Sequence, residues 1–198
     1  MLPDNIKWIV TRVGGRIASV APDWRGVLRT AKWLDAAAGH YSYKTGLKTG
    51  LQTFTTEIVT MSELQALNGT LTLDDLLLLG TDFQKEVWAE LFKLTHPEQV
   101  APGIFSYSQF AARCGKSSGL RAVAHAIGLN PINYIIPCHL IVPLDTLRRI
   151  EAAYEAAIDT IFEGRDLYVF GAFDMGDYSL GKEIKSELIA LDMQKEAI

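Results

Sequence analysis

The sequence lacks three features that would each assign it to a particular class of protein: paired cysteines, a secretion signal and a long apolar run. Its 198 residues contain two cysteines, Cys114 and Cys138, whose spacing indicates neither a disulfide framework nor a zinc site. The start, Met1 to Asn5, has no basic region followed by an apolar one, and no apolar run could span a membrane. We therefore expect a cytoplasmic protein of one large or two small domains, with no metal and no cofactor.

Acidic residues are missing from one long stretch of the chain. The net charge of -4 argues against a nucleic-acid partner. Between Glu98 and Asp145, however, there is no carboxylate, and Arg113, Lys116 and Arg121 lie inside this interval. Because a local field of one sign attracts a polyanion more than the total charge does, the interval favours contact with DNA. Three cations are few, and a weakly charged core segment is the alternative interpretation.

Residues 1–79 have the pattern of a small domain of β-sheet and helix. The apolar runs Ile6–Val13 and Arg16–Val20, separated by two glycines, predict a β-hairpin. Apolar residues at helical spacing predict a helix after it (Trp24, Val27, Leu28, Ala31, Leu34 and Ala37). Residues 40–60 show no clear pattern. Ser62 is expected to cap a short helix, which an extended connector follows.

Residues 80–198 are expected to form a second, mostly helical domain, which makes the fold α+β. Thr81 with Gln84, and Ser106 with Gln109, form capping boxes that predict the starts of two helices. Apolar residues recur at helical spacing after the first box (Phe83, Val87, Trp88, Leu91 and Leu94).

A glycine turn separates the second of these helices from a third. The turn begins at Gly115, and Ser117 or Ser118 is expected to cap the helix that follows. In that helix apolar residues share one face (Leu120, Val123, Ala124 and Ile127). Arg121 and His125, four residues apart, share the opposite face. Two helices around a glycine turn outline a helix-turn-helix.

The stretch Asn130–Pro143 places a thiol and an imidazole at the end of an apolar run. Tyr134–Ile136 predicts a buried strand, with Pro137, Cys138 and His139 at its tip. Only the thiolate of cysteine is a strong nucleophile, and a neighbouring histidine can accept the thiol proton directly or through a water. An inert buried thiol is the more ordinary interpretation of Cys-His alone. The flanking motifs favour a nucleophile.

The chain beyond Pro143 predicts two more helices. The first has one apolar stripe and ends near Gly164 (Leu147, Ile150, Tyr154, Ile158 and Ile161), and an aromatic stretch follows at 167–173. The second spans 181–193, with Asp192 at the edge of its inward face. A carboxylate near a helix C-terminus is not favoured by the helix dipole, so the pattern alone predicts a solvated Asp192.

Together these motifs resemble the O6-alkylguanine-DNA alkyltransferase family, also called methylated-DNA–protein-cysteine methyltransferases. The resemblance runs from Gly80 to Asp192 with one interruption, and the residues before it match only loosely. Its motifs are Gly80-Thr81-Asp82-Phe83-Gln84-Lys85-Glu86-Val87-Trp88, Ser106-Tyr107, Arg121-Ala122-Val123, Asn130-Pro131, Ile135-Ile136-Pro137-Cys138-His139, Tyr178-Ser179 and Gly181.

The resemblance implies DNA repair by direct transfer of an alkyl group from O6 of a flipped guanine to the protein, which is consumed in one turnover. Cys138 would be the acceptor, and His139 would be the base, acting through water. Asp192 would orient the histidine, in place of the family's glutamate. Tyr107 would donate to the leaving guanine, and Asn130 would tie the helix-turn-helix to the strand of the nucleophile.

The resemblance also implies a partner, double-stranded DNA carrying O6-alkylguanine, which a monomer would bind in the minor groove in the nucleoid or nucleus. Arg121 would take the place of the flipped base in the stack. The other expected DNA contacts are Lys116, Ser118, Ala122 and His125. Residues expected to line the substrate pocket are Pro137, Tyr178 and Ser179.

Three departures from the family pattern affect the neighbourhood of the site. Leu140 replaces a basic residue, and the shorter Asp192 is expected to lengthen the contact with His139. The chain also carries an insertion at about 144–175. Because its apolar stripe needs a surface to pack against, we expect a folded lid or side wall on the C-terminal domain.

Three other functions fit parts of the pattern. A non-catalytic damage-binding protein on the same scaffold would not need Cys138. A cysteine hydrolase could use Cys138, His139 and Asp192, although its base normally comes from elsewhere in the fold. A plain helix-turn-helix regulator would leave the Pro-Cys-His motif unexplained.

Overall fold

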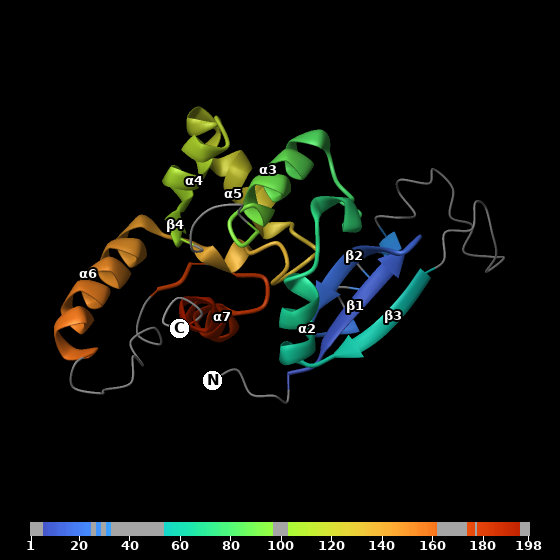
Figure 1. Ribbon diagram of the computed structural model, residues 1–198. Coiled ribbons are helices and arrows are strands. Elements are labelled where there is room, and N and C mark those ends of the chain that lie inside the picture. Colours follow the sequence, from blue (N-terminus) through green and yellow to red (C-terminus); the bar gives the residue numbers. More distant parts are fainter. Residues whose placement is uncertain are drawn as a thin grey trace.

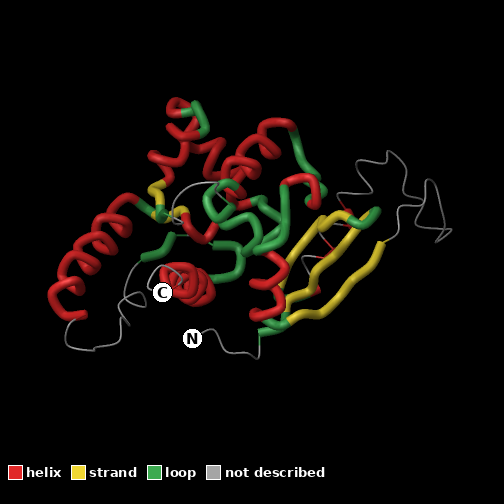
Figure 2. The backbone as a smooth tube through the Cα atoms, in the orientation of Figure 1, coloured by secondary structure: helices red, strands yellow, loops and turns green. Residues whose placement is uncertain are grey.

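The computed structural model describes residues 6–24, 27–28, 31–32, 54–96, 103–161, 174–176 and 178–194. A small β-sheet lies on one side of the molecule and a group of helices on the other (Figure 1). Strands and helices are thus largely segregated (Figure 2), and the predicted α+β class is confirmed. No helix in this described part is both long and apolar enough to cross a bilayer.

The sheet contains three antiparallel strands, β1 (Trp8–Val13), β2 (Arg16–Ala21) and β3 (Phe54–Val59), with β1 in the centre. Gly14 and Gly15 connect β1 to β2 with φ of 58° and 83°. Glycine adopts this left-handed conformation without steric cost, which is what a two-residue hairpin turn requires. The predicted hairpin is confirmed, whereas β3 lies in the stretch that showed no clear pattern.

The helix predicted after the hairpin is only partly described: residues 24, 27, 28, 31 and 32 are helical, and its remainder lies outside the described residues. The short helix α2 (Met61–Asn68) begins after Thr60, whose hydroxyl accepts from the Glu63 amide while the Glu63 carboxylate accepts from the Thr60 amide at 2.7 Å. The prediction that Ser62 caps this helix is wrong, because Ser62 already lies inside the first turn.

The connector after α2 contains a 3-10 turn, η1 (Leu73–Asp75), so it is not extended throughout. Leu76 is buried and forms a bridge with Ile17 of β2, and the Leu77 amide donates to the Ile17 carbonyl at 2.8 Å. The connector therefore runs against the sheet before it enters the helical part.

Three helices form the upper part of Figure 1: α3 (Asp82–Phe92), α4 (Tyr107–Arg113) and α5 (Leu120–Gly128). Thr81 and Ser106 cap α3 and α4 through complete capping boxes, as predicted. Each box satisfies two amides that would otherwise lack a partner, which defines the helix start.

The turn between α4 and α5 differs from the prediction in one respect. Gly115 has φ of 68°, and the 3-10 turn η2 (Ser117–Gly119) precedes α5. Gly119 is the N-cap of α5 and makes no side-chain cap, so the prediction of a serine cap is wrong. The buried Trp88 indole of α3 donates to the Ala126 carbonyl of α5 at 2.8 Å, which ties the two helices together.

The remaining elements surround the Pro-Cys-His motif. Strands β4 (Phe105–Ser106) and β5 (Ile141–Val142) pair in parallel, and the 3-10 turn η3 (Cys138–Leu140) leads into β5. Helix α6 (Leu144–Ile161) follows and extends away from the sheet (Figure 1), and α7 (Lys182–Gln194) lies below η3. Both helices were predicted, with ends that differ by a few residues.

The sheet and the helical part share one apolar core and are joined by backbone hydrogen bonds. The Val20 amide of β2 donates to the Pro131 carbonyl at 3.0 Å, and the Asn133 amide donates to the Val20 carbonyl at 3.1 Å. Large buried residues from both parts meet in this core (Trp8, Ile17, Leu64, Trp88, Leu91, Phe110, Ile132 and Ile135). The sheet thus supports the loop that leads to Cys138.

Candidate active site

The loop from Asn130 to Leu140 is buried along its whole length. It is not the strand that the apolar run predicted: Tyr134 adopts φ of 69°, and the Ile136 amide donates to the Ile132 carbonyl at 2.9 Å to close a turn. A buried loop of this kind must satisfy its polar groups internally. The prediction of burial was right and that of an extended strand was wrong.

Asn130 supplies much of that internal bonding. Its Oδ1 accepts from the Ile132 amide at 2.9 Å, and its Nδ2 donates to the Ile136 carbonyl at 2.9 Å. The same Nδ2 lies 3.1 Å from Cys138 Sγ. One amide therefore fixes the loop and also presents a donor to the sulfur, where it favours the thiolate.

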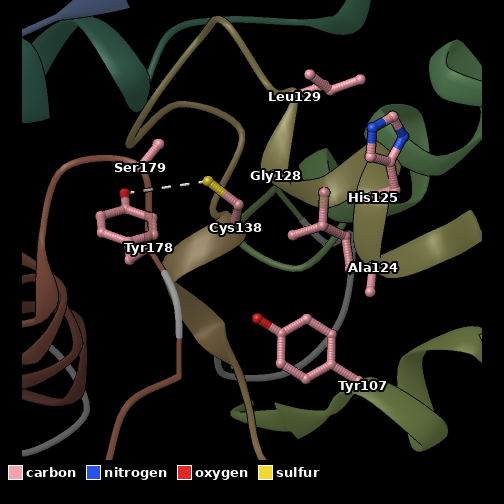
Figure 3. Close-up of a pocket in the computed structure, with 9 residues that line it drawn as sticks. Tyr107, Ala124, His125, Gly128, Leu129, Cys138, Tyr178 and Ser179 are labelled. Carbon is pink, nitrogen blue, oxygen red and sulfur yellow. Dashed lines mark hydrogen bonds between the residues drawn. The ribbon is translucent and has the colours of Figure 1, made fainter. Parts of the chain in front are cut away.

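Cys138 is 4% exposed, and burial raises the pKa of its thiol above the ordinary value. The hydrogen bonds to Asn130 and Tyr178 act in the opposite direction but are smaller causes. The thiol points toward the Tyr178 hydroxyl, with Sγ and Oη 4.0 Å apart (Figure 3). The resting group is thus a neutral thiol, which needs a base to become a nucleophile.

His139 and Asp192 form a buried pair beside this thiol. Nε2 of His139 lies 2.8 Å from Oδ2 of Asp192, and the two side chains are 0% and 3% exposed. The histidine ring also stacks on Tyr134, with ring centroids 5.9 Å apart. The pattern-based expectation of a solvated Asp192 is wrong, because α7 packs against η3 and turns this carboxylate inward.

The distance between His139 and Asp192 also shows the effect of having aspartate in place of the longer glutamate. At 2.8 Å the contact is an ordinary strong hydrogen bond, so the expected lengthening is wrong. Because Nε2 faces a carboxylate it carries the proton, which leaves Nδ1 as the acceptor nitrogen. Nδ1 of His139 is buried and has no hydrogen-bond partner among the described residues.

Next to Cys138 is a cavity of about 550 Å³. It is lined by Tyr107, Ala124, His125, Ile127, Gly128, Leu129, Cys138, Tyr178 and Ser179. In Figure 3 the Tyr107 hydroxyl points into the space in front of the sulfur, on the side opposite Tyr178. The lining includes Tyr178 and Ser179 as predicted but not Pro137, which is buried behind it.

Lys185 of α7 is a charged residue at this site that sequence reasoning missed. Its side chain is 0% exposed, and its ammonium donates to the Ile141 carbonyl at 2.6 Å and the Met175 carbonyl at 2.7 Å. It lies 5.9 Å from the Tyr107 ring centroid and 5.7 Å from that of Tyr178. The positive charge of Lys185 acts to lower the pKa of the Cys138 thiol, against the effect of burial.

Burial also affects Tyr178, because it raises the pKa of this phenol well above the ordinary value, and the nearby Cys138 adds to the effect. Tyr178 is therefore a neutral phenol near neutral pH. Among the described residues, no group of three or more histidine, cysteine or acidic side chains is placed to hold a metal ion.

Most of the residues expected to contact DNA lie on the exposed side of the helix-turn-helix. Arg121, Ala122, Ser118 and His125 are exposed, and no ion pair of Arg121 occurs among the described residues. His125 additionally belongs to the cavity lining (Figure 3). An exposed cation and small side chains on one helix face leave room for a nucleic-acid backbone.

Lys116 is the exception within this set. Its ammonium lies 2.8 Å from Glu86 of α3 and 5.0 Å from the centroid of the Phe83 ring. Arg113 similarly approaches Glu90 of α3 at 3.7 Å. The stretch without carboxylates is therefore not a field of one sign, because α3 supplies acidic partners to two of its three cations.

Leu140 and the inserted helix both lie away from the cavity. Leu140 is 0% exposed and belongs to the core. The first turns of α6 pack on the C-terminal part through Leu147 and Ile150, as expected for a folded insertion. Among the described residues, none of α6 lines the cavity, and the aromatic stretch 167–173 of the expected lid lies outside the described residues.

A family model described as 6-O-methylguanine DNA methyltransferase, DNA binding domain, matches residues 82–150. This segment contains the helix-turn-helix, Asn130, Cys138 and His139. The matched segment thus combines a helix-turn-helix with a buried cysteine. Residues 82–150 are thus similar to the 6-O-methylguanine DNA methyltransferase family, as the resemblance implied.

Individual relatives match the same part of the chain. A methylated-DNA–protein-cysteine methyltransferase of Saccharomyces cerevisiae is 42% identical over 65 residues, 33% of this chain and 32% of the yeast protein. A probable enzyme of that name from Acanthamoeba polyphaga mimivirus is 41% identical over 68 residues, 34% of this chain and 42% of the viral one. The matched stretch thus covers less than half of these relatives.

The fold has a counterpart over nearly the whole chain. The crystal structure of O6-methylguanine-DNA methyltransferase from Pyrococcus kodakaraensis superimposes with a TM-score of 0.53. The superposition covers 94% of this chain and 91% of the archaeal one, with 22% sequence identity. The likeness therefore extends to the N-terminal sheet, where it concerns the fold alone.

Proposed function

We propose that this chain repairs DNA by accepting an alkyl group from O6 of guanine onto Cys138, in a single irreversible turnover. The observation that carries the proposal is the arrangement at the sulfur: Cys138 borders a cavity of about 550 Å³ and has the His139–Asp192 pair beside it. A transfer of this kind needs a soft nucleophile, a base for its proton and a donor for the leaving purine. The similarity of residues 82–150 to the 6-O-methylguanine DNA methyltransferase family supports the same reaction.

The geometry suggests a path for each proton. The thiol proton passes through a water to Nδ1 of His139, while Asp192 stabilises the imidazolium that forms through Nε2. A buried acceptor nitrogen without a protein partner is where an ordered water is expected. The thiolate then receives a hydrogen bond from Asn130, with Nδ2 and Sγ 3.1 Å apart.

The sulfur attacks the alkyl carbon, and the carbon–oxygen bond breaks with its electron pair left on guanine. Tyr107 donates a proton to that guanine from the cavity side, as its hydroxyl orientation in Figure 3 allows. The imidazolium proton restores the phenol through solvent, so charge balances over the step. The product thioether cannot be reversed by thiol exchange, and the protein is consumed.

We propose that the partner is double-stranded DNA, bound through the minor groove by α5. Arg121 is exposed and makes no ion pair within the described part, so it can enter the stack when the damaged base is extruded into the cavity. Extrusion costs a few kcal/mol, and less for a damaged pair. Because Lys116 and Arg113 already have acidic partners, few phosphates are neutralised and the salt dependence should be shallow.

Mass spectrometry after incubation with a duplex that contains O6-methylguanine tests the reaction. We expect the protein to gain one methyl group on Cys138, the Cys138→Ser variant to gain none, and the matched Cys114→Ser variant to react normally. Arg121→Ala should slow the reaction with duplex DNA but not with the free base O6-benzylguanine. Tight binding to damaged DNA without methyl gain would instead indicate a non-catalytic damage-binding protein.

A further inference from the structure

The chain that returns from the inserted helix α6 is fixed at residues 174–176. Thr146, in the first turn of α6 and 3% exposed, donates a hydrogen bond from its hydroxyl to the Asp174 carbonyl. The Asp174 carboxylate accepts from Lys182 of α7 at 2.8 Å and from the Gly176 amide at 3.3 Å. The returning segment is thus tied to α6 on one side and to α7 on the other.

An apolar cluster holds the same three elements together. Met175 is 0% exposed and packs with residues of α6, β5 and α7 (Leu147, Ile150, Val142 and Ile189). This cluster is separate from the main core. The first two turns of α6 and the returning segment therefore form one packed unit, and the hydrogen bond from Thr146 to Asp174 joins its two parts.

This packed unit lies close to one tyrosine of the cavity, Tyr107, and bonds the lysine that lies beside both tyrosines. Gly176 has φ of +70°, and a Cβ placed there would lie 3.2 Å from Pro143 and 3.9 Å from the Tyr107 hydroxyl. The Met175 carbonyl accepts from Lys185, whose ammonium lies 5.7 Å from the Tyr178 ring centroid. Residues 174–176 thus limit the space around the Tyr107 hydroxyl and help to hold the lysine that lies beside Tyr178.

We propose that Thr146 is a positioning residue for the transfer reaction, and that the two described ends of the insertion serve to set the surroundings of the two cavity tyrosines. Thr146 touches neither substrate nor sulfur. It acts by fixing Asp174, and through it the backbone of Gly176 against the Tyr107 hydroxyl. The inference rests on the proposed function, because the tyrosine matters only if a purine leaving group must be protonated.

The reaction rates of Cys138 with two reagents distinguish this positioning role from a general destabilisation of the fold. Reaction of Cys138 with O6-benzylguanine expels a purine, which needs a donor, whereas reaction with iodoacetamide expels iodide, which needs none. All proteins carry Cys114→Ser, so that only Cys138 is labelled. In that background Thr146→Val removes the hydroxyl at constant shape, Thr146→Ser retains it, and Thr70→Val removes a hydroxyl that bonds the Leu67 carbonyl elsewhere.

We expect Thr146→Val to slow single-turnover reaction at saturating O6-benzylguanine by about fivefold, the rate equivalent of one ordinary hydrogen bond. Its rate with iodoacetamide and its affinity for O6-benzylguanine should change by less than about twofold, within the usual scatter of a distant substitution. Thr146→Ser and Thr70→Val should react as the parent does. Asp174→Asn weakens the exposed ion pair with Lys182 and leaves the apolar cluster unchanged. It should also slow the reaction with O6-benzylguanine selectively, but by a smaller factor.

Each other outcome overturns the inference. Equal rates of Thr146→Val and parent with O6-benzylguanine would exclude a positioning role for Thr146. An equal loss with both reagents would show that the hydroxyl maintains the thiol or the fold in general. If Thr146→Val does not fold, an unselective effect or no effect of Asp174→Asn rejects the idea. A parent protein that accepts no alkyl group from O6-alkylguanine would instead refute the proposed function.

Discussion

Replacing Asn130 by alanine should damage both the fold and the reaction, by amounts that can be worked out from its contacts. The side chain accepts from the Ile132 amide and donates to the Ile136 carbonyl, both at 2.9 Å, and both partners are buried. Each buried group left without a partner costs about 1–3 kcal/mol, so the loss is roughly 2–6 kcal/mol. Against a typical stability of about 5–15 kcal/mol, this loss is severe.

The effect on the reaction comes from a different atom pair. Nδ2 of Asn130 lies 3.1 Å from Cys138 Sγ and stabilises the thiolate. A hydrogen bond to a charged group is worth about 1.5–3 kcal/mol, which corresponds to a rate roughly 10- to 150-fold lower. Urea unfolding followed by tryptophan fluorescence measures the loss of stability. Single-turnover labelling with O6-benzylguanine, at a temperature where the variant is folded, measures the loss of rate.

Asn133→Ala is the matched control, because Asn133 lies in the same buried loop and has no contact with the sulfur. Its Nδ2 donates to the Val20 carbonyl at 2.9 Å, so the variant should lose stability while its folded fraction reacts normally. The reasoning fails if Asn130→Ala unfolds at the same urea concentration as the parent. It fails equally if both variants lose the same factor in rate.

Three further predictions concern the neighbouring charged groups. Asp192→Glu should destabilise the protein by about 1–3 kcal/mol without faster transfer, because an added methylene overpacks a side chain that is 3% exposed and already contacts His139. In His139→Gln, labelling of Cys138 by iodoacetamide should rise with pH through a midpoint above the ordinary pKa of a cysteine thiol, because burial raises the pKa of this thiol. Folding favours the neutral thiol, so its contribution to stability is present below the unfolded pKa and lost as pH rises through the folded one. Glu86→Gln should release Lys116 from its 2.8 Å ion pair and so strengthen DNA binding. In fluorescence anisotropy titrations, the slope of log affinity against log salt concentration should steepen by the amount expected for about one more neutralised phosphate.

Each of these three has a contrary result. A more stable or faster Asp192→Glu protein would show that the aspartate is too short for its histidine. Labelling of His139→Gln that is already complete near neutral pH would mean that the thiolate needs no base. Unchanged DNA affinity in Glu86→Gln would place Lys116 away from the bound duplex.

Structural features that depend on residues within about four positions of one another were predictable from the sequence. The capping boxes at Thr81 and Ser106 form as expected, since each is complete within one helical turn. The hairpin turn at Gly14 and Gly15 is similarly local. The strand β3 gave no such signal, because residues 55–58 are all exposed and show no alternation of buried and exposed positions.

The site itself was predictable only in part. An apolar run such as Tyr134–Ile136 indicates burial, but the same run occurs in strands and in buried turns. The positive φ of Tyr134 shows that this run forms a turn. Asp192 was assigned through the family resemblance alone, since its pattern predicted a solvated carboxylate. Lys185 escaped notice because a lysine is almost never fully buried unless it is paired. Tertiary packing determines both positions, and no spacing in the sequence encodes it.

On the strand side, the bridge between β2 and the cysteine loop consists of main-chain atoms only. The Val20 amide bonds the Pro131 carbonyl, and the Asn133 amide bonds the Val20 carbonyl. Such bonds do not depend on which side chains the sheet carries, so substitutions can accumulate in the first strands while the loop keeps its support. In amide hydrogen exchange, Val20 and Asn133 should open together, because the segment that holds the sulfur cannot loosen without releasing the edge of the sheet.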